Sequence, residues 1–102
     1  MATAVLAWWQ AQPGAGDQIA TLLHRLRRAS LTEPGCHGYE IHRSSEDADR
    51  FFLYELYDDR TAYEAHVDSD HFAELAREQG FPLLADRSRE FFELISSGTD
   101  RA

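Results

Sequence analysis

The chain alternates between segments with a helical spacing of apolar residues and segments with a strand-like spacing. Residues 18–31 carry apolar side chains at the i, i+3, i+4 and i+7 positions of an amphipathic helix, and Asp17 is the predicted N-cap. The TEPG segment, residues 32–35, ends this helix because proline cannot continue a helix interior. The apolar stripe of the helix consists of Ile19, Leu22, Leu23 and Leu26.

Four shorter segments are rich in aromatic and branched apolar residues, which is typical of β-strands. The predicted strands are residues 3–11, 36–43, 51–57 and 89–95. The second and third strands flank the polar segment 44–49, so we expect them to pair as a hairpin. Residues 61–67 are predicted to form a helix with Asp58 or Asp59 as its N-cap. A second short helix is predicted to begin at Ser69. Residues 81–88 are predicted to form a loop.

The resulting order of elements is β-α-β-β-α-β. This order matches the ferredoxin-like plait, an α+β fold in which an antiparallel sheet carries both helices on one face. A chain of 102 residues has the size of one domain, so residues 1–102 are predicted to form a single domain with its core in residues 3–96.

The predicted strands have large apolar side chains on both faces. The segment FFLYELY, residues 51–57, places aromatic rings at both parities, and Trp8 and Trp9 do the same in the first strand. In a plait with helices on one face only, the other face should carry polar residues. Burying a large apolar side chain stabilises a protein by roughly 1.5–3 kcal/mol, so a second copy should cover the bare face. We therefore expect a homodimer.

The composition excludes several classes of partner and cofactor. The net charge is −8, which disfavours binding to nucleic acid, and no apolar segment has the length of a membrane-spanning helix. The start of the chain lacks the basic region of a secretory signal, so we expect a cytoplasmic protein. A lone cysteine, Cys36, excludes an internal disulfide and a cysteine-based zinc site. No three potential ligands stand at a spacing typical of a metal site, and no glycine-rich phosphate loop occurs.

Three segments together resemble the antibiotic biosynthesis monooxygenase family. They are EPGCHGYEIHR at residues 33–43, FFLYELYDD at residues 51–59 and AYEAHVDSDHF at residues 62–72. The resemblance covers residues 3–96 and implies a dimeric ferredoxin-like α+β barrel with a pocket between the sheet and the helices. It also implies one of several activities, which include cofactor-free oxygenation of phenols or quinols, haem degradation and isomerisation of small molecules.

The haem-degrading branch is disfavoured by the residues themselves. Where those relatives carry an asparagine, a tryptophan and an iron-binding histidine, this chain has Ala7, His66 and Ala76. We therefore expect no cofactor.

His66 is the leading candidate for a catalytic base, because it lies on the helix face that should meet the sheet. A buried imidazole without a paired carboxylate has a lowered pKa and can accept a phenolic proton near neutral pH. The alternative role is a structural histidine that only bonds a strand group.

Glu55 is the second candidate, because a carboxylate among aromatic residues must be paired or neutral. It can orient His66, bind Arg43 or Arg89, or cross the dimer interface. The favoured hypothesis is structural: Glu55 forms a buried pair that fixes the register of the strands.

The predicted pocket-forming residues are Trp9, Tyr57, Tyr63, His71 and Phe72, although aromatic residues at these spacings also suit a plain core.

The first functional hypothesis is a cofactor-independent monooxygenase that oxidises a small phenolic or hydroquinone-type, polyketide-like aromatic with O2. The second is an isomerase or proton-transfer enzyme acting on a small carbonyl compound. The third is a dimeric module that binds a small ligand or haem without turnover.

Overall fold

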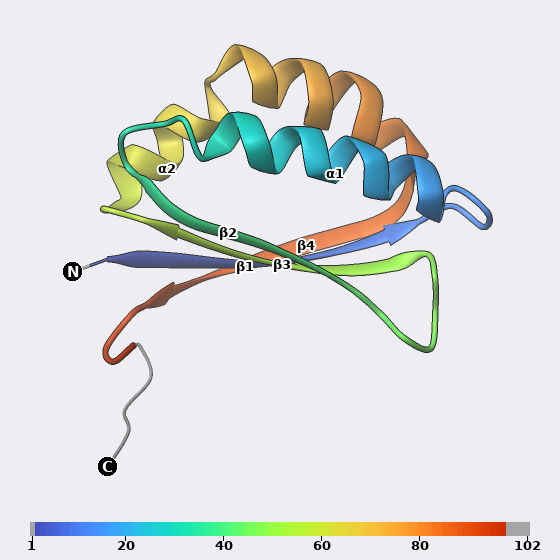
Figure 1. Cartoon of the computed structure of the whole chain (residues 1–102), viewed down its shortest axis with the longest axis horizontal. Helices are drawn as coiled ribbons and strands as arrows, with labels where there is room; N and C mark the ends of the chain where they lie inside the picture. Colours follow the sequence, from blue (N-terminus) through green and yellow to red (C-terminus); the bar gives the residue numbers. More distant parts are fainter. Residues whose placement is uncertain (1, 98–102) are drawn as a thin grey trace.

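The computed structural model describes residues 2–97 and consists of one four-stranded sheet with helices on a single face (Figure 1). The elements in chain order are β1 (Thr3–Ala11), α1 (Gly16–Ser30), β2 (Cys36–Arg43), β3 (Arg50–Tyr57), α2 (Arg60–Val67), the π-helical segment η1 (Phe72–Gly80), the short 3-10 turn η2 (Phe81–Leu83) and β4 (Leu84–Glu93). Within the described residues, no helix is both long and apolar enough to cross a membrane.

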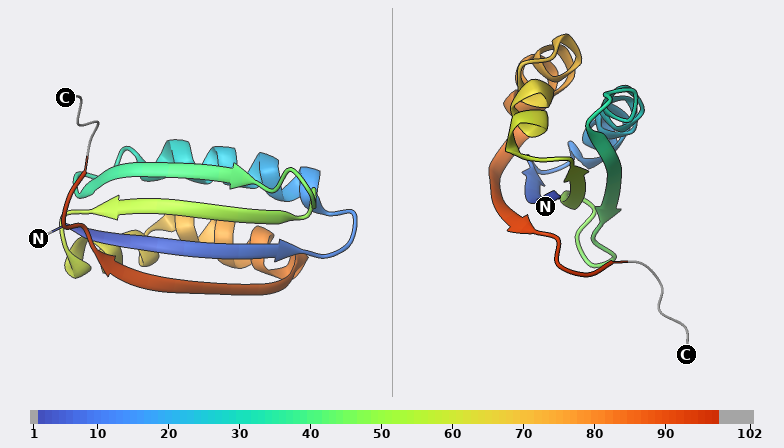
Figure 2. Two further views of the ribbon diagram at one scale, coloured as in Figure 1. Left: turned by 90° about the horizontal axis from the view of Figure 1, so that it is seen from below. Right: turned by 90° about the vertical axis from the view of Figure 1, so that its left-hand side faces the viewer.

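The sheet is antiparallel with strand order β2-β3-β1-β4 (Figure 2, left). Because β1 and β3 occupy the centre and the helices cover one face, the predicted ferredoxin-like plait is confirmed. The predicted hairpin is also confirmed, since β2 and β3 pair along their whole length.

The core lies between the sheet and α1. Alternate residues of the central strands are buried on the helix side, and the predicted apolar stripe of α1 packs on them. The strand residues on this side include Val5, Ala7, Trp9, Phe51, Leu53, Glu55 and Tyr57, and the stripe is Ile19, Leu22, Leu23 and Leu26. The strict period of two in β3 therefore places Glu55 inside, beneath the helices.

The other face of the sheet carries large side chains that no helix or strand of residues 2–97 covers. Trp8 is 40% exposed, and its ring lies 5.2 Å from that of Phe52. Phe92 on β4 is exposed on the same face, opposite Ala4 in the β1–β4 register. Figure 2 shows the described helices only on the opposite side of the sheet, as the two-sided apolar pattern indicated.

The predicted boundaries of the fourth strand were wrong. The strand runs from Leu84 to Glu93 and pairs with all of β1, whereas residues 81–88 were predicted to be a loop. Ile95, predicted to lie inside the strand, follows it and is 83% exposed. The error has a physical cause: β4 is an edge strand, so main-chain hydrogen bonds define it while most of its side chains remain exposed.

The predicted N-cap of the first helix was also wrong. Asp17 lies in the first turn of α1 and bonds the Arg43 guanidinium at 2.9 Å. The helix start is capped from a distance by Asp49, whose carboxylate accepts from the Gly14 N–H at 3.1 Å and from the Gly16 N–H at 2.9 Å. The second helix begins as expected, because the side chain of Asp59 accepts from the Ala62 N–H.

Replacing Asp49 with alanine should destabilise the protein by about 1–2 kcal/mol, since two amides at the start of α1 lose their acceptor. Urea denaturation followed by circular dichroism measures this free energy. The matched control is Asp17→Ala, which removes only an exposed ion pair and should change stability by about 0.5 kcal/mol or less. Equal losses in the two variants would contradict the assignment of the cap.

Candidate active site

A small cavity of about 80 Å³ lies between the sheet and the helical segments α2, η1 and η2. Its walls consist of Val5, Ala7, Trp9, Tyr39, Glu55, Tyr63, His66, Phe72, Phe81, Arg87, Ser88 and Arg89. Five residues singled out from the sequence, namely Trp9, Glu55, Tyr63, His66 and Phe72, therefore come together at one place. The structure does not bring Tyr57 and His71 into the cavity wall, although both lie close behind it.

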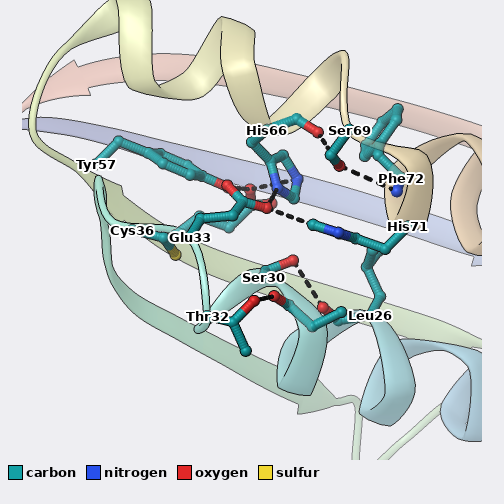
Figure 3. Close-up of polar contacts among 12 residues, drawn as sticks. Leu26, Ser30, Thr32, Glu33, Cys36, Tyr57, His66, Ser69, His71 and Phe72 are labelled. Carbon is teal, nitrogen blue, oxygen red and sulfur yellow. Dashed lines mark hydrogen bonds and ion pairs between the residues drawn. The ribbon is translucent and has the colours of Figure 1, made fainter.

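His66 lies in the last turn of α2 with a side chain that is 1% exposed. Its ring packs edge to face on Phe72 and tilted against Tyr57, with centroid distances of 5.1 and 5.4 Å. The Ser69 hydroxyl fixes the local backbone, because it donates to the His66 carbonyl at 2.6 Å and accepts from the Phe72 N–H at 3.2 Å (Figure 3). The helix end and the next helical segment are thereby tied together at the imidazole.

Glu33 is the functional candidate that sequence reasoning missed. Its Oε2 atom lies 2.8 Å from His66 Nδ1 and 2.5 Å from His71 Nε2, so one carboxylate oxygen accepts from both rings (Figure 3). The only signal in the sequence was the EPGC turn that carries it, because the contact joins residues 33 positions apart.

The loop that carries Glu33 packs tightly against α2, and glycine is required there. A Cβ added to Gly35 would lie 2.6 Å from the Cβ of Ala62, a distance that real Cβ atoms do not adopt. The Gly35 carbonyl also accepts from the Asp58 N–H at 2.9 Å, which fixes the loop to the start of the second helix.

The contact with Glu33 determines which nitrogen of His66 carries a proton. Because a carboxylate can only accept, Nδ1 of the neutral ring is the protonated atom and Nε2 keeps its lone pair. Nε2 is directed toward Glu55, 3.9 Å from its Oε1 atom. Burial lowers the pKa of His66, and the Glu33 carboxylate offsets part of this effect. At neutral pH the ring is therefore an unprotonated base.

Glu55 is buried and bonded by a tyrosine, not by an arginine. The Tyr57 hydroxyl donates to its Oε1 atom at 2.6 Å. Burial raises the pKa of Glu55 to about 7, and the Tyr57 hydrogen bond and the charge of Arg89 limit this rise. Arg43, one of the partners considered from the sequence, instead bonds Asp17 and the Ala48 carbonyl.

Two arginines of β4 border the cavity. The Arg87 guanidinium lies 3.8 Å from the centre of the Phe81 ring, and that of Arg89 lies 4.4 Å from the centre of Phe91. Both arginines are exposed and extend over aromatic surface, so their positive charges stand at the outer edge of a cavity whose interior holds Glu55 and His66.

Neither the thiol nor the deeply buried phenols are nucleophiles here. Burial raises the pKa of the Cys36 thiol to about 11, and burial followed by the charge of Glu55 raises those of Tyr39 and Tyr57 well above the usual range. All three stay protonated at neutral pH, which leaves His66 and Glu55 as the groups able to exchange protons inside the cavity.

Glu33, His66 and His71 also form a group able to hold a metal ion. Their three candidate ligand atoms lie within 4.8 Å of one another. The spacing along the chain had indicated no such set, because the carboxylate comes from a distant loop.

Comparison with known proteins gives both a family and a fold. The antibiotic biosynthesis monooxygenase family matches residues 1–78 of the sequence. Rv0793 from Mycobacterium tuberculosis is similar in structure, with 24% identity, 97% of this chain and 100% of that chain covered, and a TM-score of 0.86. PA3566 from Pseudomonas aeruginosa has 24% identity, coverages of 93% and 95%, and a TM-score of 0.86.

A structure described as an antibiotic biosynthesis monooxygenase has 23% identity, coverages of 92% and 99%, and a TM-score of 0.85. None of the functionally curated proteins matches the chain in sequence.

Replacing Glu55 with glutamine should make the protein less sensitive to pH. The native carboxyl keeps its proton up to a pKa of about 7, whereas the unfolded chain loses it near the ordinary value of 4.5. Between these values the native state binds more protons, so wild-type stability falls as pH rises. Glutamine cannot titrate, so the stability of E55Q relative to wild type should increase between pH 4.5 and 8 by up to about 3 kcal/mol.

Denaturant unfolding at several pH values measures this change. Glu90→Gln is the control, because it removes the same charge from an exposed position of β4. A gap between E55Q and wild type that stays constant with pH would contradict the assignment.

Proposed function

Because the chain belongs to the antibiotic biosynthesis monooxygenase family, we propose that it is a cofactor-independent monooxygenase that oxidises a small phenolic or hydroquinone-type aromatic with O2. The observation that carries the proposal is the buried Glu33–His66 pair, whose Nε2 atom faces Glu55 at 3.9 Å in the wall of the cavity. This arrangement is that of a general base held in one tautomer by a carboxylate.

The proposed reaction needs only proton transfer and a positioned substrate. His66 Nε2 accepts the phenolic proton, and the resulting phenolate gives one electron to O2. The substrate radical and superoxide combine at a ring carbon to form a hydroperoxide, which loses water. In sum, a phenol with a free para C–H, or a hydroquinone with a free ortho C–H, and one O2 yield a quinone with one added oxygen and one water, so no external reductant is required.

The arginines at the edge of the cavity support the anionic intermediate. A phenolate oxygen near Arg89 would be stabilised by its positive charge, which already acts on Glu55 and Tyr63 at this site. Arg89 is therefore the residue that we propose stabilises the phenolate after His66 has accepted its proton.

The size of the cavity favours the smaller members of this substrate class. About 80 Å³ holds roughly two or three water molecules at ~30 Å³ each. A planar ring requires the exposed side chains of Arg87 and Arg89 to move outward, and a single-ring phenol requires the smallest displacement.

A second function is favoured by one specific observation. Glu55, with a pKa of about 7, lies 3.9 Å from the Nε2 atom of His66. One protonated and one unprotonated group at this distance suit an isomerase that moves a proton within a small carbonyl compound. This reaction would form product without consuming O2.

We further propose that a second copy of the chain covers the bare face of the sheet. The exposed Trp8 and Phe92, with the partly buried Phe52 between β1 and β2, form the apolar surface that such a contact would bury. A homodimer of this kind leaves the helix side, and with it the cavity, free for substrate.

Replacing His66 with alanine should abolish the base and lower kcat by about 10²–10⁴-fold. Glu33→Gln should lower kcat by roughly tenfold or more, because the imidazole loses the carboxylate that orients it. The acid limb of its pH profile should also move to lower pH, because Glu33 raises the pKa of His66. An oxygen electrode with a panel of anthrones and hydroquinones measures these rates.

The control is His24→Ala, an exposed histidine of α1 that should leave turnover unchanged. Full turnover in His66→Ala would remove the proposed base. Product formation without oxygen uptake would favour the isomerase, and saturable binding without turnover would favour a ligand-binding module.

Size-exclusion chromatography with light scattering should give about twice the protomer mass at micromolar concentration. Trp8→Glu should weaken association at least tenfold, because it would bury an unpaired charge in the proposed interface. Leu31→Glu is the control, since Leu31 is an exposed apolar residue on the helix side. A wild-type protein that stays monomeric would refute the homodimer.

A further inference from the structure

The side chains of Glu33, His66 and His71 converge from three separate segments onto one point (Figure 3). Glu33 comes from the loop before β2, His66 from α2 and His71 from the helical residues directly before η1. We infer that these three residues bind a divalent transition-metal ion of the zinc class through one carboxylate oxygen and two imidazole nitrogens. The site lies beside the cavity, and its occupation does not depend on the proposed oxygenase reaction.

The donor set and its burial favour a bound ion. Two imidazoles and one carboxylate form a known type of protein ligand set for Zn²⁺, Co²⁺ and Fe²⁺, whereas Mg²⁺ and Ca²⁺ prefer oxygen donors alone. The side chains are 15% exposed at Glu33, 1% at His66 and 24% at His71. Only His71 is appreciably open to solvent, so it lies on the path by which an ion enters.

The distances between the ligand atoms require a small adjustment. In a tetrahedral site with metal–ligand bonds of about 2.0–2.2 Å, neighbouring ligand atoms lie roughly 3.3–3.6 Å apart. Here Glu33 Oε2 lies 2.8 Å from His66 Nδ1 and 2.5 Å from His71 Nε2. An ion that replaces the two shared protons therefore has to spread these ligand pairs by roughly 0.5–1.1 Å. The partial exposure of His71 leaves room for most of this movement on its side of the site.

A group suited to support a metal-bound His66 is already present. If Nδ1 binds the ion, the ring proton moves to Nε2, which lies 3.9 Å from the Oε1 atom of Glu55, so the two groups have to approach by about 1 Å to form a hydrogen bond. A carboxylate that accepts from the outer nitrogen of a metal-bound histidine fixes the ring and strengthens it as a ligand. Within residues 2–97, no other three histidine, cysteine or acidic side chains form such a group.

Metal binding and the proposed base chemistry exclude each other. A neutral His66 that binds an ion through Nδ1 carries its proton on Nε2, so it has no lone pair to offer a phenol. The same three residues would then exist in two states, one with protons shared on Glu33 and one with an ion in their place.

Direct titration of the metal-free full-length protein with Co²⁺ tests the site. Wild type should develop visible d–d absorption that saturates at one equivalent per chain, and one equivalent of Zn²⁺ should remove it. Glu33→Gln and His71→Ala should each weaken Co²⁺ binding at least tenfold. Zn²⁺ should raise the melting temperature of wild type but not of Glu33→Gln, since only a bound native state is stabilised.

The matched control is His37→Ala, because His37 also contacts a carboxylate, that of Asp58, at an exposed position of β2. This variant should bind Co²⁺ as wild type does. The absence of saturable Co²⁺ binding at 100 µM, or equal binding by wild type and Glu33→Gln, would overturn the proposal. If His71→Ala fails to fold, Glu33→Gln decides alone, since glutamine keeps the size and an acceptor oxygen of the original side chain.

Discussion

One carboxylate oxygen organises the candidate site. Glu33 Oε2 accepts from two imidazoles that belong to different segments, so it joins the loop before β2 to α2 and to the start of the next helical segment. The contact exists because Gly35 lets that loop approach α2 more closely than any residue with a side chain would allow. A single acceptor thereby sets the orientation of both rings, and the orientation of His66 decides which of its nitrogens meets the cavity.

The sequence predicted those parts of the fold in which burial follows a regular period. The apolar stripe of α1 and the alternation of buried and partly exposed side chains in β3 could be predicted because one face of each element is buried along its length. The start of β4 could not be predicted, because main-chain hydrogen bonds hold this edge strand and its sequence shows no alternation of apolar and polar residues there. Boundaries of this kind depend on the neighbouring strand rather than on local composition.

The candidate site was predictable to a similar extent and for the same reason. His66 and Glu55 were found because a polar residue on an apolar face is conspicuous in a periodic pattern. Glu33 and Asp49 were missed because each acts on a segment 33 residues away, and sequence spacing carries no information about such a contact. Their roles depend on loop geometry that only the assembled plait creates.

The position of Cys36 gives the site its own chemical reporter. The thiol is buried at the bulge where β2 begins, three residues after Glu33, and a raised pKa keeps it in the unreactive form. Alkylating reagents therefore reach it only when this edge of the sheet opens. The rate of thiol labelling then reports the opening of the chain segment that holds both Cys36 and Glu33, without any introduced probe.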